Sequence, residues 1–518
     1  MTTALQRLLE SGLQVRADDV AISVGNRFAT FAELDLEVRR CAAGMVAEGI
    51  LPGDRVALML PNRLETVVAI LGCYAVGAVA MPLNYRYVAE EAEHALSMAS
   101  PKLLLFHAER AEVIREVLDR VDPISTFRLD DEGASATAAR PFANLLAFDP
   151  IPVSADVGEQ APALLLFTSG TTALPRGVVH SHASTFAAID IARQVFDFQP
   201  SDVVLVGKPL SHAGGLNTQS FPALLAASSV VLADKPAAAE AVALITQHQV
   251  TEYGMLASDL VDFIEFLEQH PQKLPSLENS IGSGDAVPID LHHRFRDLFG
   301  WQVMEGCGMT EVGTYYTANP RHGKRKWGSM GVACPGVVIR VVDHDDQEVP
   351  VSSIGELVLQ TPSQLLEYWQ NPDATSELLR GGWLHTGDLG RVDEEGYLWF
   401  VGRKKLMIVR RGSNIAPAEV ESVIDEHPNV HASVVVGLDD AEDGHVPAAF
   451  VVPLNPSEPF DLEELRMHVA GHLAAYKNPA RYFLLAELPR TGTGKFDRHH
   501  LQVLAEGALR GESIPGEL

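Results

Sequence analysis

Hydrophobic residues in the first half of the chain recur at a helical spacing of about three to four residues and alternate with short β-rich runs. Helical spacing is found over 31–48, 65–76, 91–98 and 108–120, and strand-like runs lie at 55–59 and 102–106. In a second series we expect strands at 203–206 and 229–233 and helices at 219–226, 238–248 and 256–270. Alternating helices and strands are typical of a largely parallel sheet, so the pattern predicts two α/β subdomains.

After residue 328 the alternation of helices and strands gives way to short strand-like runs. Short strands at 338–342 and 355–360, separated by turn residues, predict a small β-barrel or sheet subdomain. Further on, helices are predicted at 418–426 and 462–473 and strands at 432–438 and 447–453. We therefore expect an α/β fold with a large N-terminal domain, residues 1–402, made of two α/β subdomains plus a small β-barrel, followed by a smaller α+β C-terminal domain, residues 403–518.

Composition narrows the classes of function. The 518 residues carry 40 Lys and Arg against 68 Asp and Glu, a formal charge of −28, which argues against nucleic acid as a partner. The four cysteines lack metal-binding spacing, as is typical of a reducing compartment.

The apolar run 67–83 is short for a membrane span and is broken by glycines and a proline, so it predicts a buried helix and a strand. With no signal-peptide pattern at the start, we expect a cytoplasmic protein without integral membrane contact. The oligomeric state, including a homodimer, stays open.

The stretch LLLFTSGTTALPRGVVHSH, residues 164–182, holds the strongest chemical signal. Four hydroxyl side chains and two glycines lie within 168–177, directly after an apolar strand, with Arg176 beside them. Backbone N–H groups of a glycine-rich turn together with Ser and Thr hydroxyls can bind phosphate, although such clusters are also ordinary turns. The spacing differs from the common P-loop.

Three further stretches are weaker when taken singly. EGCGMTE, 305–311, offers Thr310 and Glu311 for a divalent cation, but the spacing alone favours a helix N-cap with an acid in the first turn. In GWLHTGDLGRVDEEGYLWFVGRKK, Asp388 is expected in a turn between glycines, where a carboxylate can bind ribose hydroxyls, or simply close its own turn. PRTGTGK, 489–495, carries Lys495 between glycines.

In this order and at these separations, the four stretches resemble those of the AMP-forming acyl-CoA synthetase, adenylation-domain and luciferase superfamily. Supporting matches are AVGAVAMPLN (75–84), PLSHAGGL (209–216), IGSGDAVP (281–288), GSMGVACPG (328–336) and GSNIAPAEVE (412–421). The resemblance covers nearly the whole chain. It implies an enzyme that converts a carboxylic acid and ATP to acyl-AMP and then transfers the acyl group to CoA, with Mg²⁺ as the metal ion and a mobile C-terminal domain.

The resemblance also implies roles for individual residues. Catalytic roles fall to Lys495, Thr310, Glu311 (which would also hold Mg²⁺) and His212. ATP or AMP would be bound by Thr168, Ser169, Gly170, Thr171, Thr172, Arg176, Gly284, Asp285, Ala286, Gly306, Cys307, Gly308, Met309, Asp388 and Arg403. The acyl pocket would include His212, Gly214, Gly215, Met255 and Ala257, the hinge would be Lys405, and Arg410, Arg411 and Gly412 would face CoA.

Four positions depart from the usual pattern of the family. Ala173 replaces a glycine of the phosphate loop, Arg176 a lysine, Cys307 the aromatic residue that stacks on adenine, and Leu406 a frequent acidic residue after the hinge. They leave open an enzyme with weak adenylation that mainly uses preformed acyl-AMP. Two further alternatives also stay open: a stand-alone ligase that loads a carrier protein, and a non-catalytic acyl-nucleotide sensor.

The acid itself is only broadly indicated. The small side chains of the expected pocket leave room for a medium- or long-chain, aryl or bulky cyclic acid. The pocket motifs contain no unpaired basic residue, which disfavours a dicarboxylic acid.

Overall fold

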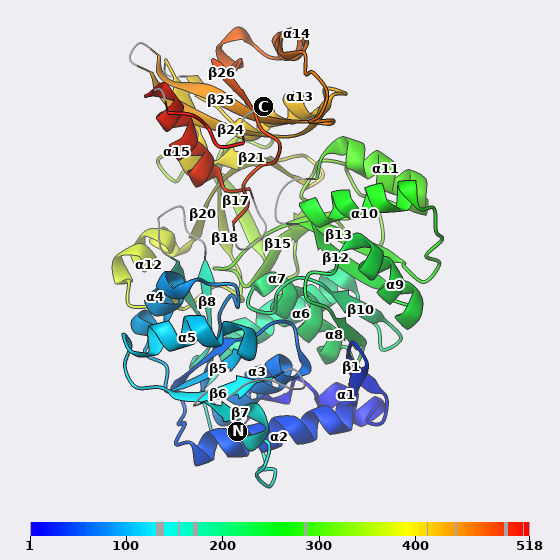
Figure 1. Cartoon of the computed structure of the whole chain (residues 1–518), viewed down its shortest axis with the longest axis vertical. Helices are drawn as coiled ribbons and strands as arrows, with labels where there is room; N and C mark the ends of the chain where they lie inside the picture. Colours follow the sequence, from blue (N-terminus) through cyan, green and yellow to red (C-terminus); the bar gives the residue numbers. More distant parts are fainter. Residues whose placement is uncertain are drawn as a thin grey trace.

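The computed structural model describes residues 2–130, 139–153, 156–168, 175–283, 287–411, 413–440, 443–491, 496–510 and 512–516. Two large mixed sheets, a smaller antiparallel sheet and a C-terminal sheet make up the strands of this described part. The C-terminal sheet lies at one end of the molecule, away from the N-terminus (Figure 1).

The first large sheet has eight strands. In spatial order they are β19 (Glu367–Tyr368), β9 (Arg176–Ser181), β8 (Pro162–Thr168), β4 (Val79–Pro82), β3 (Arg55–Met59), β5 (Leu103–His107), β6 (Ser125–Leu129) and β7 (Arg140–Pro141). The strands from β8 to β7 are parallel, and β9 and β19 extend the sheet in antiparallel pairing.

The second large sheet has nine strands and includes the start of the chain. Its order is β16 (Val332–Ala333), β15 (Thr314–Ala318), β14 (Met304–Met309), β13 (Asn279–Ser283), β12 (Glu252–Leu256), β10 (Val203–Val206), β11 (Ser229–Leu232), β1 (Val20–Val24) and β2 (Arg27–Thr30). The hairpin of β1 and β2 thus joins a sheet whose other strands come from residues beyond 200, a pairing that the hydrophobic pattern did not reveal.

One layer of helices separates the two large sheets. It contains α2 (Phe31–Ala47), α3 (Leu64–Val76), α6 (His182–Phe196) and α8 (Phe221–Leu225), whose apolar residues share one core with both sheets. Successive residues of a strand face opposite sides, so Val204 and Val206 belong to this central core and Leu205 to the outer one. Every residue of α3 is buried, which confirms the expected internal helix and strand within 67–83.

Further helices cover the outer faces. On the first sheet these are α4 (Ala89–Ala99) and α5 (Ala111–Leu118), and on the second α9 (Ala238–His248), α10 (Ala257–Gln269) and α11 (Ile289–Phe299). The structure corrects the helix expected at 219–226: α7 (Ala213–Gly215) and a π-helical turn, Leu216–Ser220, precede α8. Such wide turns occur often at functional sites.

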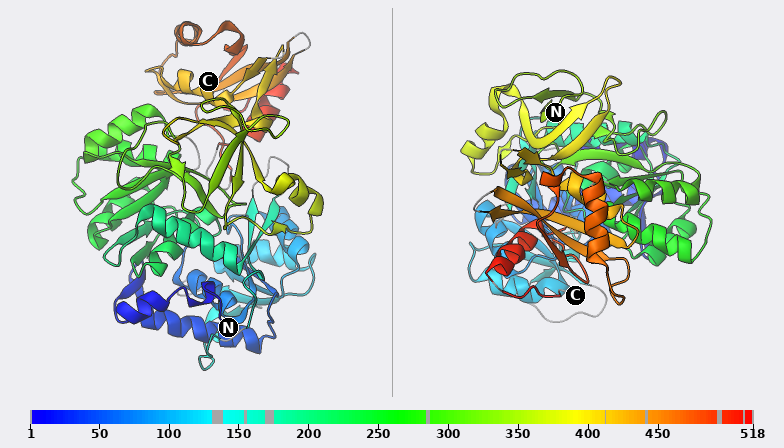
Figure 2. Two further views of the ribbon diagram at one scale, coloured as in Figure 1. Left: turned by 180° about the vertical axis from the view of Figure 1, so that it is seen from behind. Right: turned by 90° about the horizontal axis from the view of Figure 1, so that it is seen from above.

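The expected β-barrel or sheet subdomain is a four-stranded antiparallel sheet. Its order is β17 (Val338–Val342), β18 (Gly355–Gln360), β20 (Leu384–Val392) and β21 (Leu398–Arg403), and α12 (Pro372–Leu378) lies beside it. Seen from behind, this sheet lies between the large sheets and the C-terminal one (Figure 2, left).

The chain enters its C-terminal sheet after Arg403. This sheet consists of β22 (Ile408–Arg410), β23 (Ser413–Ile415), β24 (Val430–Asp440), β25 (Gly444–Pro453) and β26 (Arg481–Leu484). The helices α13 (Pro417–Asp425) and α14 (Leu462–His472) cover one face, and α15 (Arg498–Leu509) covers the other. A short 3₁₀ turn, Lys404–Leu406, connects this unit to β21.

Candidate active site

The glycine- and hydroxyl-rich loop is the tip of the hairpin between β8 and β9. Thr168, the last residue of β8, pairs with Arg176, the first residue of β9. The predicted phosphate-binding residues Ser169, Gly170, Thr171 and Thr172, as well as Ala173, lie outside the described residues. Two antiparallel strands of the first large sheet therefore fix both ends of this segment.

Thr310 and Glu311 follow β14 in a turn that leads into β15. No helix begins here, so the N-cap that the spacing favoured is wrong. The Tyr368 hydroxyl donates a 2.7 Å hydrogen bond to Glu311 Oε1. The Thr310 carbonyl lies 2.8 Å from Nε2 of the buried His180. Burial lowers the pKa of His180 to about 4, so the neutral ring donates its Nε2 proton to this carbonyl.

Tyr368 is a site residue that the motifs did not reveal. The Arg176 guanidinium lies over its ring, 5.8 Å from the centroid, while its hydroxyl bonds Glu311. Burial, and after it the negative charge of Glu311, raises the pKa of Tyr368, which keeps the phenol protonated as a donor. One side chain thus connects the base of the phosphate loop with the predicted metal ligand.

Asp388 lies in strand β20 rather than in a turn, directly after Gly387, which has a positive φ of 70°. Its side chain is buried, and its Oδ1 lies 3.1 Å from Arg403 Nε across the β20–β21 pair, with the arginine side chain 51% exposed. The Tyr316 hydroxyl donates to Asp388 Oδ2 at 3.0 Å, and Cys307 Sγ lies 2.7 Å from the same hydroxyl. Because the phenol has a single proton, the Cys307 thiol donates to Tyr316.

Glycines let β14 approach its neighbour closely. A Cβ at Gly306 would lie 2.8 Å from the backbone oxygen of Thr317, and one at Gly308 would lie 2.7 Å from that of Thr314. Met309, the last residue of β14, packs partly buried against the central core. Close packing of β14 against β15 therefore accounts for the two glycines of EGCGMTE.

The other nucleotide and C-terminal residues are only partly described. Gly284, Asp285 and Ala286, which directly follow β13, lie outside the described residues, as do Gly412 and Lys495. Lys405 is exposed in the 3₁₀ turn between the last two sheets. Arg410 Nε lies 2.7 Å from Asp443 Oδ2, and Arg411 pairs with the other oxygen of the same carboxylate. These hydrogen bonds lower the pKa of Asp443, that from Arg410 most strongly.

The expected acyl-pocket residues come from two neighbouring segments. His212 immediately precedes α7, which contains Gly214 and Gly215. A Cβ at Gly215 would lie 2.4 Å from the Pro209 carbonyl, so only glycine fits this turn. From the second segment, Met255 lies buried in β12 and Ala257 begins α10.

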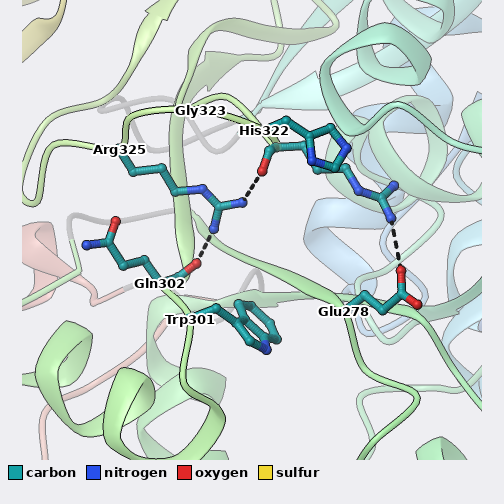
Figure 3. Close-up of a pocket in the computed structure, with 7 residues that line it drawn as sticks. Glu278, Trp301, Gln302, His322, Gly323 and Arg325 are labelled. Atoms are coloured by element: carbon teal, nitrogen blue, oxygen red, sulfur yellow. Dashed lines mark hydrogen bonds and ion pairs between the residues drawn. The ribbon is translucent and has the colours of Figure 1, made fainter.

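A separate pocket of about 310 Å³ contains none of the predicted residues. Arg325 is bonded there to backbone oxygens of Gln302 and Arg321 (Figure 3). The lining residues are Glu278, Trp301, Gln302, Arg321, His322, Gly323 and Arg325. Its cations are thus already engaged by the protein.

The residues present fit a magnesium ion that is shared with phosphates. Among the described residues, no group of three or more His, Cys, Asp or Glu side chains could hold a metal alone. Glu311 offers one partly exposed carboxylate, and Mg²⁺ usually takes one or two carboxylates together with phosphate oxygens. None of the helices in the described part of the chain is long and apolar enough to cross a membrane.

Together, a hairpin with a hydroxyl- and glycine-rich tip, the nearby carboxylate of Glu311 and the buried Asp388 paired with the exposed Arg403 are what a nucleotide-binding α/β enzyme requires. Sequence profiles of the AMP-binding enzyme and of its C-terminal domain match residues 9–369 and 419–495. The chain belongs to this family, the adenylate-forming superfamily that its motifs resemble.

Similar proteins extend over most of the chain. A feruloyl-CoA synthase of Amycolatopsis sp is 33% identical over 481 residues, 92% of this chain and 94% of the relative. The fatty acid–[acyl-carrier-protein] ligase ScoC of Streptomyces coeruleorubidus is 33% identical over 93% of this chain and 92% of its own length. The crystal structure of the anthranilate CoA ligase AuaEII in complex with anthranoyl-AMP has a TM-score of 0.91 at 25% identity and covers 98% of this chain and 99% of that one.

Proposed function

We propose that this protein is an AMP-forming acyl-CoA ligase. In the first half-reaction a carboxylate oxygen of the acid bonds to the α-phosphorus of ATP, and the bond from that phosphorus to pyrophosphate breaks. In the second, the CoA sulfur, having lost its proton, bonds to the acyl carbon, and AMP leaves with the electron pair of the C–O bond. Because the first step joins two anions, positioned cations and hydrogen-bond donors must supply most of the acceleration.

The connection made by β14 is the observation that supports this function most. At Cys307 the strand contacts the Tyr316–Asp388 network, and the turn after it carries Glu311. The proposed ribose-binding Asp388, in β20, is thus linked through Tyr316 to Cys307 of β14, and the proposed metal-binding Glu311 follows the same short strand. This arrangement suits a ligand that carries both a sugar and phosphates.

We assign the roles accordingly. Asp388 and Arg403 bind the ribose hydroxyls, Thr310 contacts the α-phosphate, and Glu311 holds Mg²⁺. Mg²⁺ supplies positive charge that offsets the repulsion between the phosphates and the incoming acid. From the resemblance, the β- and γ-phosphates go to Thr168, Ser169, Gly170, Thr171, Thr172 and Arg176, the adenine lies along Gly284, Asp285, Ala286 and the 306–309 strand, and Lys495 bridges the acid and the α-phosphate.

The two half-reactions call for two positions of the C-terminal domain. Lys495, which we assign to ATP and the acid, and Arg410 and Arg411, which we assign to CoA, all belong to residues 403–518. We propose that the domain turns about Lys405, an exposed residue for which no polar partner is found within the described part of the chain. Arg410 and Arg411 then face the CoA phosphates, with one net positive charge left after pairing with Asp443.

The acid that we propose is a medium- or long-chain, aryl or bulky cyclic one, since Gly214 and Gly215 take little space beside His212. The names of relatives, a feruloyl-CoA synthase and a fatty acid–carrier-protein ligase, support this range. The second also supports a second candidate function, the loading of a carrier protein instead of CoA. The four free cysteines support a reducing compartment, the cytoplasm, as the location. The assigned residues all lie on one chain, and a homodimer stays a prediction.

The test follows both half-reactions separately. The purified protein is incubated with ATP, Mg²⁺, CoA and fatty, aryl or polycyclic acids, and AMP and acyl-CoA are measured by mass spectrometry. We expect equal amounts of both products with one class of acid. In Lys495→Ala the overall reaction is expected to fail, while synthetic acyl-AMP and CoA still give thioester; Lys273→Ala, an exposed lysine elsewhere, is the matched control.

Each other outcome identifies an alternative. Thioester formed from acyl-AMP but not from acid and ATP would support the enzyme with weak adenylation. Product formed with an acyl carrier protein but not with CoA would support the second candidate. Binding of acyl-AMP without formation of any product would support the non-catalytic acyl-nucleotide sensor.

A further inference from the structure

Lys208 is a buried cation next to the expected acyl pocket. It follows β10 and lies four residues before His212, in the segment that leads to α7. The residue is 5% exposed. Its side chain passes Gly214, where a Cβ would lie 3.5 Å from Lys208 Cδ. The ammonium therefore lies among residues that the resemblance assigns to the acid.

The ammonium bonds one serine hydroxyl, which belongs to a small group of hydroxyl side chains. Lys208 Nζ donates a 2.6 Å hydrogen bond to Ser283 Oγ, which donates at 3.3 Å to the Met255 carbonyl. The Tyr315 hydroxyl interacts with the side chains of Ser283 and Thr218. Polar groups that converge in a mostly apolar pocket are the usual means by which a protein orients a ligand.

The charge of Lys208 has no close counterion in the described part of the protein. No carboxylate there forms an ion pair with Nζ, and only one of its three N–H groups has a hydrogen-bond partner. Asp259 and Glu252 act on it from a distance, and the Glu252 carboxylate is already bonded by Asn279 Nδ2 at 2.9 and 3.0 Å. Burial lowers the pKa of Lys208 to about 8 in spite of both acids, and at neutral pH the side chain stays mostly protonated.

A role in holding the fold does not account for such a side chain. Asn62 already fixes this segment, because its Nδ2 donates to the carbonyls of Lys208 and Ala233 at 2.9 and 2.8 Å, and its Oδ1 accepts from the Leu210 N–H at 2.9 Å. A neutral donor could bond Ser283 without the cost of burying an unpaired charge. An anionic ligand would supply the missing counterion.

We infer that Lys208 determines substrate specificity by binding an anionic group at the far end of the acid, so that the preferred substrate carries a second carboxylate. This inference rests on the proposed function and deepens it. It also reverses the expectation that a dicarboxylic acid is disfavoured, which considered only the stretches SHAGGLNTQSF (211–221) and EYGMLASD (252–259) and therefore left out Lys208. Ser283, which accepts from Lys208 and donates its only proton to the Met255 carbonyl, holds the ammonium in place for this carboxylate.

The test compares matched acids that differ only at the far end: octanoate with octanedioate, and cinnamate with 4-carboxycinnamate and 4-hydroxycinnamate. Acid-dependent ATP–pyrophosphate exchange gives kcat/KM for each acid, and the readout is the ratio of the substituted acid to the plain one. We expect a ratio of at least about ten for a dicarboxylate in the wild-type protein. Lys208→Met should bring that ratio to about one or below, and Lys273→Met should keep the wild-type ratio.

The ratio distinguishes specificity from stability. A structural role of Lys208 would lower kcat/KM for both acids of a pair in proportion and leave the ratio unchanged, which would overturn the inference. A wild-type ratio below one in every pair, or a preference for 4-hydroxycinnamate over 4-carboxycinnamate, would overturn it as well. Exchange with the plain acids but not with the dicarboxylates would overturn the inference about Lys208 and would still support the proposed function. If the proposed function itself is wrong, no acid will give exchange.

Discussion

Replacing Lys208 by methionine should make the protein more stable at neutral pH, even though it removes a hydrogen bond. Burial lowers the pKa of the ammonium from its usual 10.5 to about 8. At 1.36 kcal/mol per pKa unit, the protonated lysine costs the folded state roughly 3 kcal/mol at pH 7. Methionine is of similar length, is uncharged and adapts its shape, so we expect the variant to unfold with a free energy about 1–3 kcal/mol higher.

The lowered pKa of Lys208 also determines how the difference in free energy of unfolding between the two proteins changes with pH. At pH 7 the lysine is protonated in both states. Between pH 8 and about 10.5 the unfolded chain binds more protons at Lys208 than the folded protein, so wild-type stability rises relative to the variant and the difference shrinks. The attraction of Asp259 and Glu252 opposes the effect of burial and is already included in the lysine pKa of about 8.

Urea unfolding followed by tryptophan fluorescence measures this effect in the right part of the chain. All five tryptophans precede residue 403, so their signal reports on the unfolding of residues 1–402, the part of the chain that contains Lys208. Wild type, Lys208→Met and Lys273→Met are compared at pH 7, 8, 9 and 10. A Lys208→Met variant less stable than wild type at pH 7, by an amount that does not change with pH, would refute the reasoning.

Three further predictions concern the nucleotide site and its support. Asp388→Asn, which removes the ribose-binding charge, should raise the KM for ATP about 10- to 100-fold; an unchanged KM would contradict its role. Tyr368→Phe removes the donor to Glu311, so the Mg²⁺ concentration for half-maximal exchange should rise about tenfold, with activity regained at high Mg²⁺; an unchanged Mg²⁺ titration would exclude this positioning role. Gly308→Ala places a Cβ 2.7 Å from a backbone oxygen of β15 and should destabilise the protein by about 1–3 kcal/mol in urea unfolding, whereas equal stability would mean that β14 can shift.

Local patterns predicted the elements whose own residues determine them. The strands Arg55–Met59 and Val338–Val342 and the helix Ala238–His248 have the predicted bounds, because their apolar periodicity is strong and their ends carry turn residues. The pairing of β1 with β11 depends on residues about 200 positions apart, which no local pattern encodes.

In the candidate site, too, the features encoded by contiguous residues were predicted from the sequence, and those that depend on distant residues were not. Its motifs were visible because they are contiguous, but Tyr368 gains its role only by reaching Glu311, 57 residues earlier in the chain. Lys208 was overlooked because a lysine is usually exposed, and only the structure shows that this one is buried against Ser283.

The measurement that most directly tests the central claim is acid-dependent exchange of labelled pyrophosphate into ATP in the absence of CoA. The account predicts exchange with at least one class of carboxylic acid, its loss in Asp388→Asn at low ATP, and no exchange without acid. Absence of exchange with every acid tested, in a protein that binds ATP and is folded, would contradict the assignment of an adenylating site.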